Sequence, residues 1–185
     1  KGPRSCQAGQ VKKQPVRLRK SQKCASLHGG REGYTGDPRK PPATKIIAIG
    51  ETGLDGVIAK QQNNMNQQSL FFEFQLHLAQ EHKLPVIVHH RRTHNEIITL
   101  LKRVKVSRGG IIHAFSGSYQ QACQYIDLGF KLGIGGTITY PRAEKTIKAI
   151  KRLPLSSLVL ETDAPSMPLY GYQGKNNSPL HTISI

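Results

Sequence analysis

Short apolar runs alternate with longer amphipathic stretches from residue 45 to residue 163. The apolar runs read "KIIAIG", "PVIVH", "GGIIHAF", "FKLGIGG" and "SSLVLETD", at 45–50, 85–89, 109–115, 130–136 and 156–163. None shows an alternation of polar and apolar residues. Each therefore predicts a strand that is covered on both faces.

The stretches between these strands predict helices at 69–83, 93–104, 118–129 and 143–153. In the first of them, Phe71, Phe74 and Leu78 recur at helical spacing. The second helix places Ile97 and Leu101 on one apolar face.

Two of the predicted helices begin with the spacing of a capping box, in which a Ser or Thr is followed three residues later by Glu or Gln. These pairs are Thr93 with Glu96, and Ser118 with Gln121. Gly129 is a typical stop for the helix that Ser118 begins.

The order of elements, strand and helix in turn, predicts an α/β fold with a parallel sheet covered by helices. Two arrangements fit this order. One is an open doubly wound sheet, and the other is part of a (β/α)8 barrel. Hydrophobic periodicity does not separate them.

Residues 1–45 differ from the rest of the chain. They hold 12 Lys and Arg against Glu32 and Asp37, out of a net charge of +16 for the 185 residues. They are rich in Gly and Pro and show no sustained period, so we expect a disordered or non-homologous basic segment followed by a domain at 46–185. A basic balance of this size favours nucleic acid as a partner.

Polar groups gather at the ends of the predicted strands, where parallel α/β folds carry their chemistry. The first strand ends at Glu51, the second at His89 and His90, and the third carries His113. The fifth ends with Glu161 and Asp163, whereas the fourth ends in Gly135-Gly136-Thr137 and offers no ligand. Two His and two carboxylates at one end of one sheet predict a mixed nitrogen and oxygen metal site.

The pair His89-His90 cannot face one site while the strand is extended, because adjacent residues point to opposite faces. We favour His89 for the metal, and we expect His90 either to support a ligand side chain or to form the pocket wall. Arg91 and Arg92 follow directly and are candidates for binding the phosphate of an anionic substrate.

Five ordered motifs resemble the TatD-like family of metal-dependent hydrolases and DNases, and especially its YjjV-type branch. They read "IIAIGETGLDG", "PVIVHHRRTHNE", "GGIIHAFSGS", "LGIGGTITYPRA" and "LVLETDAPSMPLYGYQG", and cover the chain from Ile46 to about Pro179. The resemblance implies a (β/α)8 barrel with one or two divalent metals at its mouth. It also implies hydrolysis of phosphodiester bonds, commonly as a deoxyribonuclease.

Residue by residue, the resemblance places the family's metal ligands at Glu51, His89, His113 and Asp163. Asp163 is then also the residue that handles the attacking water, so the expected catalytic residues are Asp163 and Glu51. Glu161 and Asp55 are expected to steady ligand side chains, and Asp55 is equally suited to cap the next segment. The metal, Mg²⁺, Mn²⁺ or Zn²⁺, stays open.

The chain departs from the family pattern at both ends. It lacks the H-x-H motif that the family carries on its first strand, because His28 is the only histidine before Glu51. It also lacks a further helical stretch after Asn177. We therefore expect an incomplete barrel of about five βα units, with one metal site in place of two.

Other functions compete with DNA hydrolysis. A catalytically impaired chain would act only as a basic nucleic-acid-binding module, and related metal barrels cleave amides and esters. Phe115, Tyr140 and Tyr170 either stack on bases or fill the core. The sequence has no long apolar run and no apolar leader, so we expect a cytoplasmic protein with no membrane partner. The oligomeric state stays open.

Overall fold

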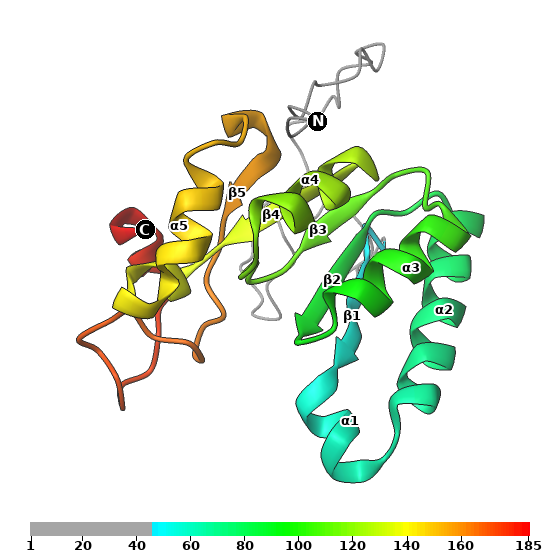
Figure 1. Ribbon diagram of the computed structural model, residues 1–185, viewed down its shortest axis with the longest axis horizontal. Helices are drawn as coiled ribbons and strands as arrows, with labels where there is room; N and C mark the ends of the chain where they lie inside the picture. The colour runs from blue at the N-terminus through cyan, green and yellow to red at the C-terminus, as the bar shows by residue number, and fades with distance from the viewer. Residues whose placement is uncertain (1–45) are drawn as a thin grey trace, which may run out of the picture. The chain divides into compact units, whose positions relative to one another are not determined.

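A parallel sheet of five strands forms the centre of the computed structural model, which describes residues 46–185 (Figure 1). The predicted disordered segment 1–45 lies outside the described residues and stays a prediction. The strands are β1 (Ile49–Asp55), β2 (Val86–Arg91), β3 (Gly110–Ile112), β4 (Phe130–Ile134) and β5 (Leu158–Leu160).

Helices connect all consecutive strands. The α-helices are α1 (Gly56–Gln62), α2 (Met65–Glu81), α3 (His94–Val104), α4 (Tyr119–Asp127) and α5 (Glu144–Ile150). Short 3₁₀ helices are η1 (Gly136–Thr139), η2 (Pro141–Ala143), η3 (Leu155–Ser157) and η4 (Pro179–Ser184). Within residues 46–185, no helix has both the length and the apolar character that crossing a bilayer would require.

The strand order decides between the two predicted arrangements. The strands lie in chain order, β1-β2-β3-β4-β5, and every neighbouring pair is parallel. A doubly wound sheet reverses its strand order at a switch point, whereas consecutive right-handed crossovers place all helices on one face. Figure 1 shows α3, α4 and α5 on the same side of the sheet. The structure is therefore part of a (β/α)8 barrel, as the motifs predicted.

Alternation along the strands separates a helix-facing side from a barrel-interior side. Val86 and Val88 of β2 are fully buried, whereas Ile87 and His89 between and after them are only partly buried. Leu54, Ile112 and Leu132 continue the buried side on β1, β3 and β4. The main core thus lies between the sheet and its helices.

The first strand begins and ends later than predicted, because β1 starts at Ile49 and Gly50 lies inside it. Ile49 pairs with Val86 and Thr52 with Val88, so β1 carries one extra residue there. Further along, Gly53 has φ +154°, and a Cβ on it would lie 2.0 Å from the His89 carbonyl oxygen. Close approach of two backbones requires glycine at this position.

One of the two predicted capping boxes is confirmed and the other is wrong. Ser118 and Gln121 form both reciprocal bonds at the start of α4. Thr93 precedes α3 but makes no side-chain cap. Its Oγ1 instead donates to the Leu54 carbonyl oxygen at 2.8 Å, which gives this buried hydroxyl a partner on β1.

Helix α2 packs on the sheet with a different face from the one that the spacing of Phe71, Phe74 and Leu78 singled out. Its buried residues are Phe72, Leu76 and Ala79. Phe71 and Phe74 are 62% and 66% exposed. The helix is apolar on more than one side, so periodicity alone could not select the side that meets the sheet.

We predict that two neighbouring substitutions in α2 change the stability of the protein by very different amounts. Phe72→Ala should lower the free energy of unfolding by about 3–5 kcal/mol, because it leaves a cavity under the sheet. Phe71→Ala should change it by less than about 0.5 kcal/mol, because little of that side chain is buried among the described residues. Urea unfolding of both variants measures the difference, and equal losses would contradict the helix orientation.

Candidate metal centre

A polar pocket of about 610 Å³ opens at the carboxyl end of the sheet. It is lined by the ends of β1, β2 and β3, by the start of η1 and by the segment after β5. Its lining residues are Glu51, Asp55, His89, His90, Arg91, Arg92, His113, Ala114, Ser116, Thr137, Asp163 and Met167. Every one of the four predicted metal ligands therefore reaches the same pocket.

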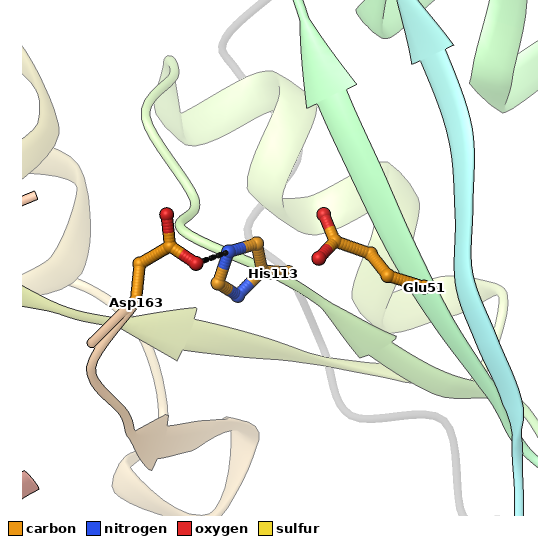
Figure 2. A group of neighbouring side chains, drawn as sticks. All are labelled: Glu51, His113 and Asp163. Carbon is orange, nitrogen blue, oxygen red and sulfur yellow. Dashed lines mark ion pairs between the residues drawn. The ribbon is translucent and has the colours of Figure 1, made fainter. Parts of the chain in front are cut away.

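Three of those ligands share a common focus. Glu51, His113 and Asp163 each offer one ligand atom, and these atoms lie within 4.8 Å of one another. Figure 2 shows the two carboxylates on either side of the His113 ring, with Asp163 Oδ1 3.3 Å from His113 Nε2. The three residues come from β1 and from the segments after β3 and β5, so the sheet itself brings them together.

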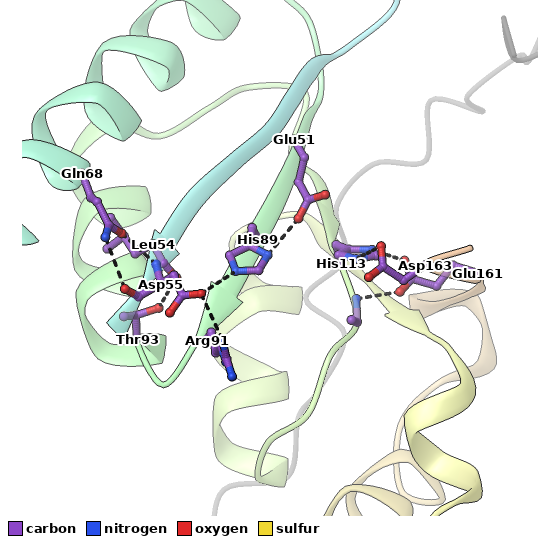
Figure 3. Close-up of polar contacts among 11 residues, drawn as sticks. Glu51, Leu54, Asp55, Gln68, His89, Arg91, Thr93, His113, Glu161 and Asp163 are labelled. Carbon is purple, nitrogen blue, oxygen red and sulfur yellow. Dashed lines mark hydrogen bonds and ion pairs between the residues drawn. The ribbon is translucent and has the colours of Figure 1, made fainter. Parts of the chain in front are cut away.

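Glu161 fixes the orientation of the central histidine. Its Oε2 lies 2.9 Å from His113 Nδ1, and its Oε1 accepts the backbone N–H of Ala114 at 2.7 Å. Both carboxylate oxygens are thus engaged on one segment (Figure 3). A carboxylate on Nδ1 leaves Nε2 to face Asp163 and the pocket, which is how metal-binding histidines are commonly held.

The surrounding carboxylates favour the protonated form of His113. The hydrogen bond to Glu161 is the main cause, and the negative charges of Glu161, Glu51 and Asp163 add to it. Burial opposes them, yet the pKa of His113 is raised to about 9. In the metal-free protein, the ring is therefore a cation among acids, and binding of a metal at Nε2 would displace its proton.

His89 lies beside the three-residue group but outside it. Its Nδ1 is 2.8 Å from Glu51 Oε1, and its Nε2 is 3.8 Å from Asp55 Oδ2. Figure 3 shows the ring between these two carboxylates. In this arrangement, His89 holds Glu51 from the side opposite His113, and its direct ligation of a metal stays a prediction.

Asp55 serves the local backbone as well as the pocket. Its Oδ1 accepts the N–H groups of Val57 and Ile58 and so caps α1. Partial burial raises the pKa of Asp55, but these two bonds and the nearby Arg91 guanidinium outweigh burial and lower it. Arg91 Nη1 lies 3.5 Å from Oδ2. The capping role that the sequence allowed for Asp55 is thus confirmed, whereas its support of a metal ligand stays a prediction.

His90 points away from the three-residue group, as alternation requires. It is 92% buried, and burial is the first cause that lowers its pKa to about 3, so the ring is neutral. It packs against His94 with ring centres 4.3 Å apart. Its Nε2 has no hydrogen-bond partner among the described residues. His90 therefore forms the pocket wall, with no polar contact to a predicted ligand.

His94 is a residue of this site that the sequence-based reading missed. Its Nε2 donates to the Ser116 carbonyl oxygen at 2.9 Å, and its Nδ1 then accepts from the Tyr125 hydroxyl at 3.0 Å. It ties the start of α3 to the loop after β3 that carries His113. This histidine is part of the "HHRRTHNE" motif. Its place at the start of a helix, however, did not predict contacts with Ser116 and Tyr125.

The arginines predicted to bind phosphate and the aromatic residues predicted to stack on bases or fill the core lie in different parts of the structure. Arg91 and Arg92 are exposed at the pocket rim. Phe115 is fully buried and packs edge-on against Tyr125, so it belongs to the core. Tyr140 and Tyr170 pack against each other with ring centres 5.7 Å apart.

The chain matches known proteins over most of its described length. The sequence profile "TatD related DNase" matches residues 41–185. An uncharacterized metal-dependent hydrolase of Haemophilus influenzae is 51% identical over 138 residues, which make up 74% of this chain and 53% of the relative. The uncharacterized metal-dependent hydrolase YjjV of Escherichia coli K12 is 50% identical over 141 residues, 76% of this chain and 53% of its own.

Solved structures agree with the fold. The crystal structure of Escherichia coli YjjV, described as a TatD homolog, superposes with a TM-score of 0.71 over 75% of this chain and 53% of that one. An uncharacterized amidohydrolase from Saccharomyces cerevisiae, 24% identical, gives a TM-score of 0.58 over 69% and 43% of the two chains and shows likeness of fold alone.

This chain spans about half the length of these curated relatives. Within that half lie all five quoted motifs and the residues that meet in the pocket. With a family profile over more than half of its residues and relatives of about 50% identity, the chain belongs to the TatD-related DNase family.

Proposed function

We propose that this chain carries the metal centre of a hydrolase that cleaves phosphodiester bonds, with DNA as substrate. The observation that carries the proposal is the convergence of Glu51, His113 and Asp163 on one focus at the carboxyl end of the sheet. The relatives support the broad class, because they are described as metal-dependent hydrolases. The profile name adds DNA as the substrate to test.

The donor set suits a divalent metal. One imidazole and two carboxylates form the mixed nitrogen and oxygen set that Zn²⁺ and Mn²⁺ accept, and carboxylates also suit Mg²⁺. Glu161 presents His113 in the orientation a ligand needs. When bound, the metal would acidify a water molecule and neutralise charge on the phosphate.

The side chains at the rim supply the other functions of a hydrolase site. Asp163 is 37% exposed in the pocket, so it can reach an incoming water and accept its proton. Arg91 and Arg92 line the same pocket and offer charged donors to phosphate oxygens. Arg91 is positioned for this by Asp55.

A second candidate function is binding of a polyanion without turnover. It is favoured by the position of His89, which contacts Glu51 and Asp55 instead of completing the three-residue group. The two candidate functions differ in their need for a metal. DNA cleavage by a hydrolase requires the metal, whereas binding of a polyanion does not.

The position of Glu161 depends on a glycine in the strand between β3 and β5. A Cβ on Gly133 of β4 would lie 2.3 Å from Glu161 Oε2. Glu161 therefore reaches across β4 to His113 only because residue 133 has no side chain. A Cβ on Gly135, two residues later, would meet Glu161 atoms no closer than 3.5 Å, which is an ordinary contact.

We predict that the chain cleaves single-stranded DNA in Mg²⁺ or Mn²⁺ and that EDTA abolishes the cleavage. Asp163→Asn should reduce the rate by at least about 100-fold, because it removes both a ligand and the proton acceptor. Asp127→Asn, which alters an exposed carboxylate at the end of α4, is the matched control and should leave the rate unchanged. Equal rates with and without metal, or no cleavage at all, would contradict the proposed hydrolase.

We predict that metal binding releases about one proton at pH 7.5. The pKa of His113 is raised to about 9, so the ring is protonated at this pH and must lose its proton to bind through Nε2. Metal affinity should rise with pH up to about 9 for the same reason. Calorimetric titration with Zn²⁺ in two buffers of different ionisation enthalpy measures the proton count.

Glu161→Gln serves as the control for this measurement. It removes the main cause of the raised pKa of His113, so less than one proton should be released at pH 7.5. A wild-type titration with no proton release would show that His113 is not a ligand.

We predict that Gly133→Ala lowers metal affinity by about 10–100-fold, because the new methyl group displaces Glu161 from His113. Gly135→Ala is the matched control and should change the affinity little. Calorimetry of both variants with Zn²⁺ tests this, with thermal unfolding to confirm that both fold. A similar affinity for the two variants would contradict the role of the glycine.

A further inference from the structure

A groove between α4 and α5 carries a concentration of positive charge outside the metal centre. Its volume is about 640 Å³. Its lining residues are Ser118, Tyr119, Gln120, Glu144, Lys145, Lys148, Ala149, Lys151 and Arg152. Four of these side chains are cationic and only one is acidic, so the groove is suited to an anion.

The acidic residue does not cancel this charge. Glu144 pairs with Lys148 one helical turn later, and both side chains are highly exposed. An exposed pair of this kind is weak, so Lys148 stays available to a ligand. Lys145, Lys151 and Arg152 have no acidic partner among the described residues.

The lysines form a row rather than a scattered set. Lys145, Lys148 and Lys151 follow one another at intervals of three residues along α5 and the residue after it, which keeps helical dihedrals. Residues three apart in a helix are neighbours on its surface, offset by about 60° around the axis, and rise by about 4.5 Å. The axial spacing of phosphates in one DNA strand is about 3.4 Å, so such a row can meet successive phosphates of a flexible strand.

One end of the groove is held rigid by a stacked pair. The guanidinium carbon of Arg152 lies 3.8 Å from the centre of the Tyr119 ring, at the start of α4. The contact fixes the Arg152 charge at the point where the two helices meet.

The loop after β3 contributes residues to both the groove and the metal pocket. Ser116 lines the metal pocket, and Ser118, two residues on, lines the groove. Both α4 and α5 begin at the carboxyl end of the sheet, where the metal pocket lies. Lys145, in the first turn of α5, is close enough that its charge adds to burial in lowering the pKa of His94, the residue bonded to Ser116.

We propose that this α4–α5 groove binds the phosphate backbone of the nucleic-acid strand that is cleaved at the metal centre. The inference rests on the proposed function only in taking the cleaved bond to be a phosphodiester. Binding of the strand in the groove does not depend on it. It separates two tasks: the metal pocket acts on one phosphodiester, while Lys145, Lys148 and Lys151 hold the strand several nucleotides away. Longer strands should therefore bind more tightly than a single phosphodiester.

The test compares two triple variants of the full chain. Lys145→Gln, Lys148→Gln and Lys151→Gln together remove the row from the groove. Lys102→Gln, Lys105→Gln and Arg108→Gln remove equal charge from exposed positions at and after the end of α3, at the other end of the sheet. Residues 1–45 are unchanged in both variants, so their charge contributes equally.

Binding of a fluorescent single-stranded 12-mer is measured by anisotropy in EDTA, where no cleavage occurs. The groove variant should bind at least about 10-fold more weakly than wild type. Its log–log salt slope should fall by about 2, since each phosphate contact on a single strand contributes about 0.7. The control variant should lose markedly less in both measurements. An unchanged affinity of the groove variant, or an equal loss in the control, would overturn the proposal.

Two further measurements distinguish this proposal from the proposed catalysis and from binding of an acidic peptide. Hydrolysis of bis(p-nitrophenyl) phosphate in Mn²⁺ reports the metal centre alone and should be the same in the groove variant as in wild type. If the metal centre proves inactive but the 12-mer result holds, the proposed catalysis fails and the groove stands. If an acidic 12-residue peptide competes as well as the DNA strand does, the groove is an acidic-peptide site and the proposal is overturned.

Discussion

The alternation of side chains along parallel strands is the constraint on which this site depends. Consecutive residues of β2 must face opposite sides, so His89 meets Glu51 over the barrel interior while His90 packs beneath α3 against His94. Glu161 and Asp163, two residues apart just after β5, both reach His113. A slip of one residue in any of these strands would exchange the polar set for the buried one.

Contacts between strand ends and helix starts make the rim rigid. Asp55 ends β1 and caps α1, and the Thr93 hydroxyl before α3 bonds to the carbonyl of Leu54. His94 continues this chain of contacts to Ser116 and Tyr125. The residues that face the pocket are therefore carried by backbone whose polar groups are already satisfied, which is the setting that a preorganised site requires.

Much of this arrangement was predictable from the sequence, for identifiable reasons. The parallel sheet followed from apolar runs without polar alternation, and the pocket from polar residues at the ends of those runs. Alternation predicted that His89 and His90 face opposite sides, and the resemblance to the family placed the ligand at His89. Family membership was predicted from five ordered motifs. Hydrophobic periodicity alone predicted the strands and helices but not the function.

Other features could not be predicted because they depend on tertiary contacts. The face of α2 that meets the sheet was not evident, because Phe71, Phe72 and Phe74 are all apolar and only packing selects Phe72. Thr93 fitted a local capping pattern, yet a carbonyl distant in the sequence took its hydroxyl. Gly133 carried no signal of its own, because its importance lies in a carboxylate that arrives from another strand.

The two outer strands of the described sheet restrict how copies of this chain could join. Within residues 46–185, β1 pairs only with β2 and β5 only with β4. A two-fold axis perpendicular to the sheet beside β1 would set it against its own copy in the antiparallel sense, which breaks the common strand direction of a barrel. Pairing β5 of one copy with β1 of the next keeps every strand parallel and every metal pocket at the same end. A contact of this kind would be head-to-tail, unlike the symmetric contact of a two-fold dimer.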